Sequence, residues 1–528
     1  RSGAFGETPA GLRGPAPSEV SGRSVLAVLD APRFVPRAGG ATPPAQPVPR
    51  GLQGTSGFDF GNHAPDIYLF VAAGGYEAMR TEFLRLSGSI PALPAWAFGL
   101  WFTWYHPYSQ KEKTEEIQRF LDDDLGLSVV SLDRNWRQGA SNTTVVLPDE
   151  GEYIVNRDLF PDMDGFLAWV HDQGLRTFFN DHPKYLDSGE QGPGSGAPEA
   201  VLAPAEVQFR WDGLTSLMHR GLDFWWFDCH WRWYPPALSV PGGGSVDGIT
   251  WGQAVFQDIT ARYIRENRPE YDSTPFSMGC SESHHPASHR YPVWWTGDIF
   301  NTNLMSSVAD MIRAGYEGFK PYVHPDCGGH HGHNEPEVYV RWIQFCSLGT
   351  IMRVHSDPWN DRRPWTYGGQ VEDIFRSFVK LRLRLVPELM SASVEATRVG
   401  APLVTRLDAE WPHLPGAARM DQYLLAGSML VAPIDPFPGG SPDRKSDFNR
   451  SRSVWIPPGE WTDAFSGATV QGPREIRRAD VPLDELPLYH RRGALVVAAR
   501  GAGGAAEADW AGLVVHCWPP APGAAAAA

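Results

Sequence analysis

The run LDFWWFD, at residues 222–228, is short and largely aromatic, and it ends in an acidic residue. Apolar runs of this length, bounded by polar residues, are typical of strands that are buried on both faces of a sheet. Such runs predict eight strands between residues 98 and 354. The other seven are FGLWFTW (98–104), LSVVSLD (127–133), LRTFFND (175–181), TPFSMGC (274–280), PVWWTGD (292–298), GFKPYV (318–323) and GTIMRV (349–354).

Helical patterns lie between several of these runs. EEIQRFLDDDLG (115–126) and MDGFLAWVHDQG (163–174) each place their large apolar side chains on one helical face. Strands that alternate with helices form parallel sheets, and eight such units over roughly 260 residues fit a closed (β/α)₈ TIM barrel. An open doubly wound sheet ranks lower, because no Gly-rich phosphate fingerprint follows the first run.

The flanking segments differ from the barrel in composition. Residues 1–90 are expected to be partly disordered, with a strand at 66–71 and a helix at 75–88. Residues 91–392 form the barrel, including a helix at 371–392. Short β-like pieces predict a small all-β sandwich domain at 393–498, followed by a low-complexity tail at 499–528 in which LVVHCW is a candidate strand.

Charge and cysteine content restrict the partners and the compartment. The net charge of −15 and the pI of about 5.6 argue against nucleic acid, and no apolar run predicts a membrane span or a signal peptide. The spacing of the five cysteines suggests no disulfide framework, which favours a reducing compartment, whereas sequons at Asn142 and Asn449 favour the opposite. Localisation and oligomeric state therefore stay open.

Acidic residues stand at the ends of several predicted strands, where the active site of a TIM barrel lies. A single acid there could be a helix N-cap, but a set of them beside paired tryptophans favours a carboxylate-based active site. Glycosidases need two carboxyl groups, one ionised and one protonated, although the sequence does not give their separation. The strand-end residues include Asp133, Trp136, Asp181, Asp228, Asp298 and Asp326.

Several motifs resemble, in order, the signatures of glycoside hydrolase family 31, and the resemblance extends over about residues 66–498. The motifs are GLDFWWFDCHW (221–231), SHRYPVWWTGD (288–298), HPDCGGHHG (324–332), EPEVYVRWIQFCSLGTIMRVHSDPW (335–359), YLLAGSMLVAPI (423–434) and LPLYHRRGAL (486–495).

The resemblance implies a retaining α-glycosidase that cleaves terminal α-linked sugars through a covalent glycosyl-enzyme. Asp228 matches the nucleophile of the family and Asp298 matches its acid/base, and no cofactor is implied. The remaining predicted substrate-binding residues either match positions that line the sugar subsite or stand beside them. These are Asp133, Trp136, Trp226, Trp295, Asp326 and His355, with Glu282 and His330 at positions that depart from the family pattern.

The two departures affect the expected substrate. Glu282 lies sixteen residues before Asp298, where the family commonly has a sugar-binding Arg, and His330 stands where the family often has Phe. An α-galactosidase or α-N-acetylgalactosaminidase type of specificity, an α-transglycosylase, and a catalytically weak carbohydrate-binding barrel therefore remain alternatives. By the resemblance, the strand and helix in residues 1–90 are the remnant of the family's N-terminal β-sandwich, and the rest of that domain is not recognisable, so the sequence does not predict chain-length specificity.

A metal-dependent hydrolase is the rival enzyme class. The segment HPDCGGHHGH (324–333) is rich in His, Asp and Cys, but its spacing matches no standard zinc pattern, and the Gly pair suggests a loop close to a ligand. We therefore predict no metal.

Overall fold

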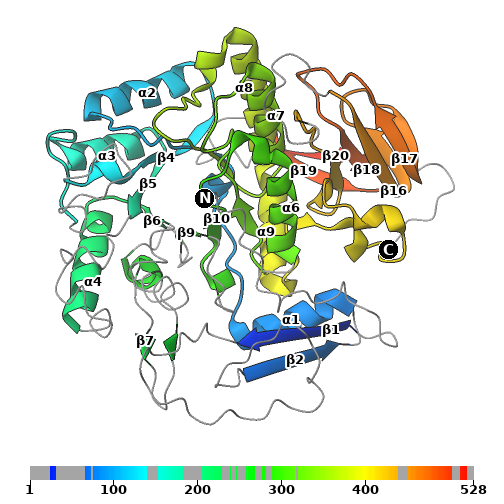
Figure 1. Ribbon diagram of the computed structural model, residues 1–528, viewed down its shortest axis with the longest axis horizontal. Coiled ribbons are helices and arrows are strands. Elements are labelled where there is room, and N and C mark those ends of the chain that lie inside the picture. Colours follow the sequence, from blue (N-terminus) through cyan, green and yellow to red (C-terminus); the bar gives the residue numbers. More distant parts are fainter. Residues whose placement is uncertain are drawn as a thin grey trace.

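The computed structural model contains an eight-stranded parallel sheet at its centre (Figure 1). The structure describes residues 24–30, 66–72, 75–138, 153–181, 204–228, 238–239, 245–246, 257, 260–267, 276–280, 288–316, 319–437, 450–501 and 512–519. The strands are β3 (Leu100–Phe102), β4 (Leu127–Leu132), β5 (Arg176–Asp181), β6 (Phe224–Phe227), β9 (Met278–Cys280), β10 (Val293–Trp295), β11 (Tyr322–His324) and β12 (Met352–Val354). Each of the eight runs predicted from the sequence thus contains one strand, at least in part.

The order of the strands is that of a nearly closed barrel. Neighbours in the sheet run β11-β10-β9-β6-β5-β4-β3-β12, and every pair is parallel. The two edge strands approach each other, because the N–H of Cys327, beyond the end of β11, donates to the carbonyl of Arg353 in β12 at 3.0 Å. The prediction of a TIM barrel is confirmed.

Aromatic side chains fill the inside of this barrel. The rings of Phe178 and Phe224 are stacked with centroids 4.9 Å apart. The ring of Trp101 lies 5.3 Å from that of Phe178, and the ring of Phe276 lies 4.6 Å from that of Phe224. All four residues are buried. Short strands with such large side chains form a solid core, which fixes the strand ends relative to one another.

The helices surround the sheet with the apolar faces that the sequence predicts. In α2, Ile117 and Phe120 are buried, and Ser109 begins the helix with a capping box to Glu112. The helices around the barrel are α2 (Gln110–Asp122), α3 (Met163–Asp172), α4 (Pro204–His219), α6 (Leu304–Tyr316), α7 (Pro336–Ser347) and α8 (Gly369–Arg384).

The single helix predicted at 371–392 is wrong in detail. Two helices occupy this region, α8 and α9 (Val386–Val399), and they meet at Leu385. Pro387 lies in the first turn of α9, where a missing N–H is tolerated, whereas inside a continuous helix it would remove a hydrogen bond. Gly400, with φ of 72°, ends α9 in the left-handed conformation.

The described segments before residue 90 contain one strand more than the sequence suggested. The predicted strand and helix are present as β2 (Asp66–Ala72) and α1 (Gly75–Ser87), and β1 (Ser24–Asp30) pairs antiparallel with β2. Arg80 of α1 donates to the carbonyls of Gly400 and Tyr316 at 2.5 and 2.6 Å, so α1 is fastened to the barrel helices.

A C-terminal antiparallel domain lies beside α6, α7 and α9 (Figure 1). Its six-stranded sheet has the order β13-β14-β15-β18-β16-β17, and a separate ribbon pairs β19 (Leu495–Ala499) with β20 (Leu513–Cys517). The candidate strand in LVVHCW is confirmed as β20. The strands of the sheet are β13 (Val404–Thr405), β14 (Tyr423–Leu425), β15 (Met429–Val431), β16 (Arg452–Asp463), β17 (Thr469–Arg478) and β18 (Leu488–Arg491).

Cysteine pairing differs from the expectation. Cys327 and Cys346 form a disulfide across 19 residues, Cys280 is disulfide-bonded as well, and Cys517 is free and exposed. Sequence spacing could not reveal the Cys327–Cys346 bond, because the partners come from the loop after β11 and the end of α7. Only the closed fold brings their Cα atoms to 6.1 Å.

None of the helices in the described ranges is both long and apolar enough to cross a bilayer.

Candidate active site at the carboxyl ends of the barrel strands

The barrel brings its strand-end acids to one mouth, because parallel strands all end on the same side. Asp133 directly follows β4 and Asp228 directly follows β6, while Asp298 and Asp326 lie in the loops after β10 and β11. Asp181, at the end of β5, is paired with buried Arg137 at 2.5 Å. The carboxylate of Asp181 therefore takes part in a buried structural ion pair.

One side of the mouth is built around Asn180. Its side-chain Nδ2 donates to Oδ1 of Asp133 and to Oδ2 of Asp228, both at 2.8 Å. Asp133 and Asp228 are 5% and 7% exposed, respectively. A neutral amide thus holds the two carboxyl groups in a fixed relation, and its N–H groups favour their ionised forms.

Asp133 has two roles in this arrangement. It caps the short helix Arg134–Trp136 through a bond from the Arg134 N–H at 2.7 Å, while its Oδ2 lies 3.7 Å from Nε2 of His355. Burial raises the pKa of Asp133 to about 6, and the negative charge of Asp228 adds to this effect. Asp133 is therefore both the helix cap that a strand-end acid often is and a member of the site.

Asp298 has a different environment. Its side chain retains 53% exposure towards the mouth, yet protein groups surround it on several sides. This partial loss of solvation raises the pKa of Asp298; the charges of Asp228 and Asp326 act in the same direction, and His330 opposes them. Asp298 is accordingly the carboxyl group of the site that is both accessible and inclined to hold a proton.

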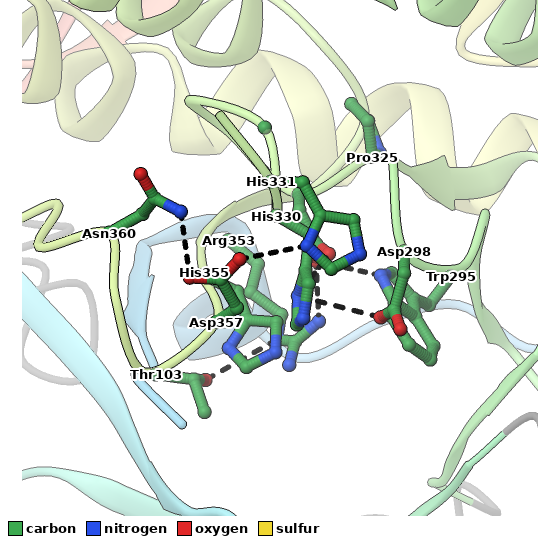
Figure 2. A network of polar contacts seen from close by, with 12 residues as sticks. Thr103, Trp295, Asp298, Pro325, His330, His331, Arg353, His355, Asp357 and Asn360 are labelled. Carbon is green, nitrogen blue, oxygen red and sulfur yellow. Dashed lines mark hydrogen bonds and ion pairs between the residues drawn. The ribbon is translucent and has the colours of Figure 1, made fainter. Parts of the chain in front are cut away.

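His330 lies close to two carboxylates, and Figure 2 shows its contact with Asp298. Its Nδ1 is 3.4 Å from Oδ1 of Asp298 and 3.3 Å from Oδ2 of Asp326. Burial by itself would lower the pKa of His330, but Asp298 and Asp326 outweigh it and raise the pKa to about 9. Two groups in contact, Asp298 and His330, are therefore both inclined to hold a proton.

Asp326, Arg353 and two tryptophans form the floor next to His330. Oδ1 of Asp326 accepts from Nε1 of Trp295 at 2.7 Å and from Nη1 of Arg353 at 2.9 Å. The guanidinium of Arg353 lies 4.1 Å from the ring centroid of Trp226, and the two indoles meet edge to face at 5.0 Å. The two buried tryptophans thus pack against the ion pair of Arg353 and Asp326.

His355 completes the floor as a neutral base. Burial lowers the pKa of His355 well below its usual value, and the charges of Arg353 and His330 add to this effect. Its ring stands at 88° to Trp226 with centroids 5.2 Å apart. A neutral imidazole in this position can accept or donate one hydrogen bond to a ligand.

Several buried polar atoms around the mouth have no hydrogen-bond partner among the described residues. They include Oδ1 of Asn180, Nε1 of Trp226, Oδ2 of Asp326, Nδ1 of His330, Nη2 of Arg353 and Nε2 of His355. Leaving such groups unpaired costs about 1–3 kcal/mol each, so a polyhydroxylated ligand would satisfy a set that includes both donors and acceptors.

Close backbone contacts and hydrogen bonds fix the loop that carries Asp326 and His330. Gly329 has φ of 78°, and a Cβ at this position would lie 2.4 Å from the backbone nitrogen of Asn301. Arg362 donates to the carbonyl of Gly329 at 3.1 Å, and His331 is bonded to Asp357 at 2.8 Å (Figure 2). The Gly pair in HPDCGGHHGH thus allows a close backbone approach that places His330.

Not every predicted substrate-binding residue lines the mouth. Trp136 is fully buried and donates its indole N–H to the carbonyl of Asn180 at 2.7 Å. It therefore helps to position Asn180. Glu282 lies outside the described residues. Asp133, Trp226, Trp295, Asp326, His330 and His355 are brought together around the two predicted catalytic aspartates.

Two central residues were not selected as site residues from the sequence. Asn180 and Arg353 were visible as polar residues at the ends of the β5 and β12 runs. Nothing in their spacing distinguishes a bridge between two carboxylates from an ordinary strand end. The position of Asn180 beside Asp133 follows from the register of β5 with β4 and β6, and that of Arg353 beside Asp326 follows from the approach of the two edge strands.

A metal ion does not fit this network well. Asp326, His330 and His355 have ligand atoms within 4.8 Å of one another, as do Asp298, His330 and His331. However, Arg353 already occupies Asp326 with a positive charge at 2.9 Å, and a second cation there would be repelled. The donor set fits sugar hydroxyls better than a metal.

A separate cavity of about 390 Å³ adjoins the network. Trp104, in its wall, donates its indole N–H to the carbonyl of Asp357 at 2.9 Å. Neither Asp228 nor Asp298 belongs to its described lining, so we assign it no part in bond cleavage. The lining is Trp104, His106, Tyr108, Glu112, Glu115, Glu116, Arg119, Arg363 and Trp365.

Comparison with known proteins agrees with this geometry. Residues 90–392 match the TIM-barrel domain of glycosyl hydrolases family 31, and residues 400–496 match the C-terminal domain of that family. The chain belongs to glycoside hydrolase family 31. Members of this family are retaining α-glycosidases, and both matched domains appear in the order that the fold shows.

Curated relatives of the family 31 chain have several specificities. An alpha-xylosidase of Emericella nidulans is 26% identical over 402 residues, which are 70% of this chain and 49% of the relative. Alpha-glucosidase 2 of Bacillus thermoamyloliquefaciens is 21% identical over 486 residues, which are 83% of this chain and 59% of the relative. The chain thus spans about half to three fifths of the length of these relatives.

A solved structure supports the fold. The family 31 dextranase of Flavobacterium johnsoniae, complexed with glucose, superposes with a TM-score of 0.70 at 17% identity, covering 87% of this chain and 59% of that chain. At this identity the likeness establishes the architecture and leaves the substrate to be argued from the site.

Proposed function

We propose that the protein is a retaining α-glycosidase, with Asp228 as nucleophile and Asp298 as general acid/base. The observation that carries the proposal is the asymmetry of the two carboxyl groups. Asn180 donates a hydrogen bond to buried Asp228, which favours a carboxylate, whereas the raised pKa of accessible Asp298 favours a carboxylic acid. A retaining glycosidase requires this division of roles.

In the first step, Oδ of Asp228 attacks the anomeric carbon from the face opposite the α-linked leaving group. Asp298 transfers its proton to the departing glycosidic oxygen, and the bond between that oxygen and the anomeric carbon breaks. The result is a β-linked glycosyl ester on Asp228. Asp298 is then a carboxylate and ready to act as a base.

In the second step, Asp298 removes a proton from water while the water oxygen attacks the anomeric carbon. The ester bond to Asp228 breaks, and the sugar leaves with its original α configuration. If another sugar hydroxyl replaces water, the same chemistry gives transglycosylation. Positive charge develops on the sugar ring in both transition states, and carboxylates around the mouth stabilise it electrostatically.

We propose that Trp226 and Trp295 contact the apolar face of the cleaved sugar, and that Asp133, Asp326 and His355 bind its hydroxyls. Trp226 Nε1 and Arg353 Nη2 supply donors, and Asn180 Oδ1 supplies an acceptor. Glu282 and His330 remain proposed substrate-contacting residues. Because His330 can carry a positive charge, an acidic sugar belongs in the substrate panel, beside galactose-type and amino sugars.

The domain boundaries predicted from the sequence, at 90/91, 392/393 and 498/499, are retained as proposals.

The stereochemistry of the first product tests the proposal. Proton NMR of an early reaction mixture should show the α anomer of the released sugar before mutarotation, because two inversions restore the configuration. Incubation with a slow fluorinated glycosyl donor should also add one glycosyl mass to the peptide that contains Asp228. A β product formed first, or a label on another peptide, would refute the retaining mechanism with Asp228.

A further inference from the structure

The charge pair between Asp298 and His330 is the feature that the two-step mechanism leaves unused. Nδ1 of His330 lies 3.4 Å from the proposed acid/base and 3.3 Å from Asp326, and the ring is buried. A site with an apolar residue here would leave Asp298 as the sole carrier of the catalytic proton. The imidazole adds a second atom that can hold it.

We propose that His330 is a positioning residue that shares the catalytic proton with Asp298, so that the Asp298–His330 pair is the acid/base unit. This inference rests on the proposed function. Before the first step, the pair carries one proton, which leaves with the glycosidic oxygen. Asp298 and neutral His330 then remain, and the proton removed from water restores the pair in the second step.

The surroundings favour a single proton shared by the pair. Asp326 and Asp357 favour a proton on His330, while the positive charge of Arg353 is opposed to Asp326 and Asp298. His331, whose ring meets that of His330 at 4.6 Å, is itself bonded to Asp357 at 2.8 Å. The titratable and charged groups that face the pair are Asp228, Asp326, His331, Arg353, His355 and Asp357.

A proton shared between Asp298 and His330 should shift the alkaline limb of the pH profile in a definite direction. The singly protonated pair can place its proton on either residue, so it loses that proton at a higher pH than Asp298 would beside a neutral, non-basic side chain. The wild-type kcat/KM should therefore fall on the alkaline side near the pKa of His330, about 9. In His330→Gln the fall should begin at least about one pH unit lower.

The test compares kcat/KM profiles of the wild type, His330→Gln and a control, His413→Gln, which removes an exposed imidazole. The alkaline limb should move to lower pH in His330→Gln and stay in place in the control. The acid limb should move less, because Asn180 rather than His330 donates to Asp228. An alkaline limb that is unchanged or moves to higher pH would overturn the shared proton.

Histidine NMR provides a readout that needs neither turnover nor a stable His330 variant. The resonance assigned to His330 should titrate near pH 9 in the wild type and at a clearly lower pH in Asp298→Asn. A midpoint at or below about 6.5 in the wild type would overturn the inference while leaving the glycosidase proposal intact. A high midpoint in a folded protein that cleaves no α-glycoside would instead overturn the proposed function and the catalytic role of the pair.

Discussion

The two sides of the barrel mouth contain similar groups in different arrangements. On the β4–β6 side, the neutral amide of Asn180 joins Asp133 to Asp228, both buried. On the β10–β12 side, the ionisable ring of His330 lies between half-exposed Asp298 and buried Asp326. An amide keeps its hydrogen bonds at any pH, whereas an imidazole changes charge. The first side therefore suits a fixed nucleophile, and the second suits proton transfer.

Removal of the proposed nucleophile, on the β4–β6 side, should cause the largest loss of activity. Asp228→Gly is expected to lower kcat by about 10⁴-fold or more, because no covalent intermediate can form. Azide added to this variant should enter from the vacated face and yield a β-glycosyl azide, which mass spectrometry and NMR would identify. If azide gave no product and the variant kept most of its activity, Asp228 would not be the nucleophile.

Removal of the acid on the opposite side should produce a loss that depends on the leaving group. Asp298→Asn is expected to slow cleavage of an alkyl α-glycoside by about 10²–10⁴-fold. A dinitrophenyl glycoside should lose much less in the first step, because its leaving group needs no proton. An equal loss for both substrates would contradict the role of Asp298.

Removal of the Asn180 amide tests the β4–β6 side of the mouth. Asn180→Ala takes away the N–H groups that favour the ionised forms of Asp133 and Asp228. The acid limb of kcat/KM should move to higher pH, with a loss of stability of about 1–3 kcal/mol. Urea unfolding and a pH profile measure both effects. A profile whose acid limb stays in place would show that Asn180 does not control these carboxyl groups.

The smallest effect concerns stability rather than turnover. Burial raises the pKa of Asp133 to about 6, above the value of about 3.9 in an unfolded chain. The folded state then binds the proton more tightly, so the free energy of unfolding falls as pH rises from about 4 to about 6. Asp133→Asn should remove this fall and be more stable than the wild type at pH 7, by about 1–3 kcal/mol.

The comparison for Asp133→Asn is the difference in unfolding free energy between variant and wild type at pH 3 and at pH 7. Activity should decrease in the same variant, because Asn cannot supply a negative charge. A difference that is equal at both pH values would contradict the raised pKa of Asp133.

Much of the fold was predictable, because each barrel strand is a short apolar run with a polar end. The runs around Phe224 and Trp294 contain so many large apolar side chains that the local sequence is enough to predict buried strands. The break at Leu385 was less clear, since the residues on both sides of Pro387 favour a helix. Strand β1 lay in an isolated run whose partner β2 is more than thirty residues away.

The site was predictable where a residue type carries the chemistry, and less so where position carries it. The candidate aspartates and tryptophans could be named from strand ends and motifs. The bridging role of Asn180, the support from Trp136 and the proximity of His330 to Asp298 depend on neighbouring strands and loops. Contacts between distant segments leave no periodic pattern in the sequence.

The most direct test of the central claim is turnover of p-nitrophenyl α-glycosides of glucose, xylose, galactose, N-acetylgalactosamine and sulfoquinovose, with Asp228→Asn as the control. The account predicts release of p-nitrophenol from at least one of these substrates by the wild type and its loss in the variant. Silence of the folded wild type on all five, or undiminished turnover by Asp228→Asn, would contradict it.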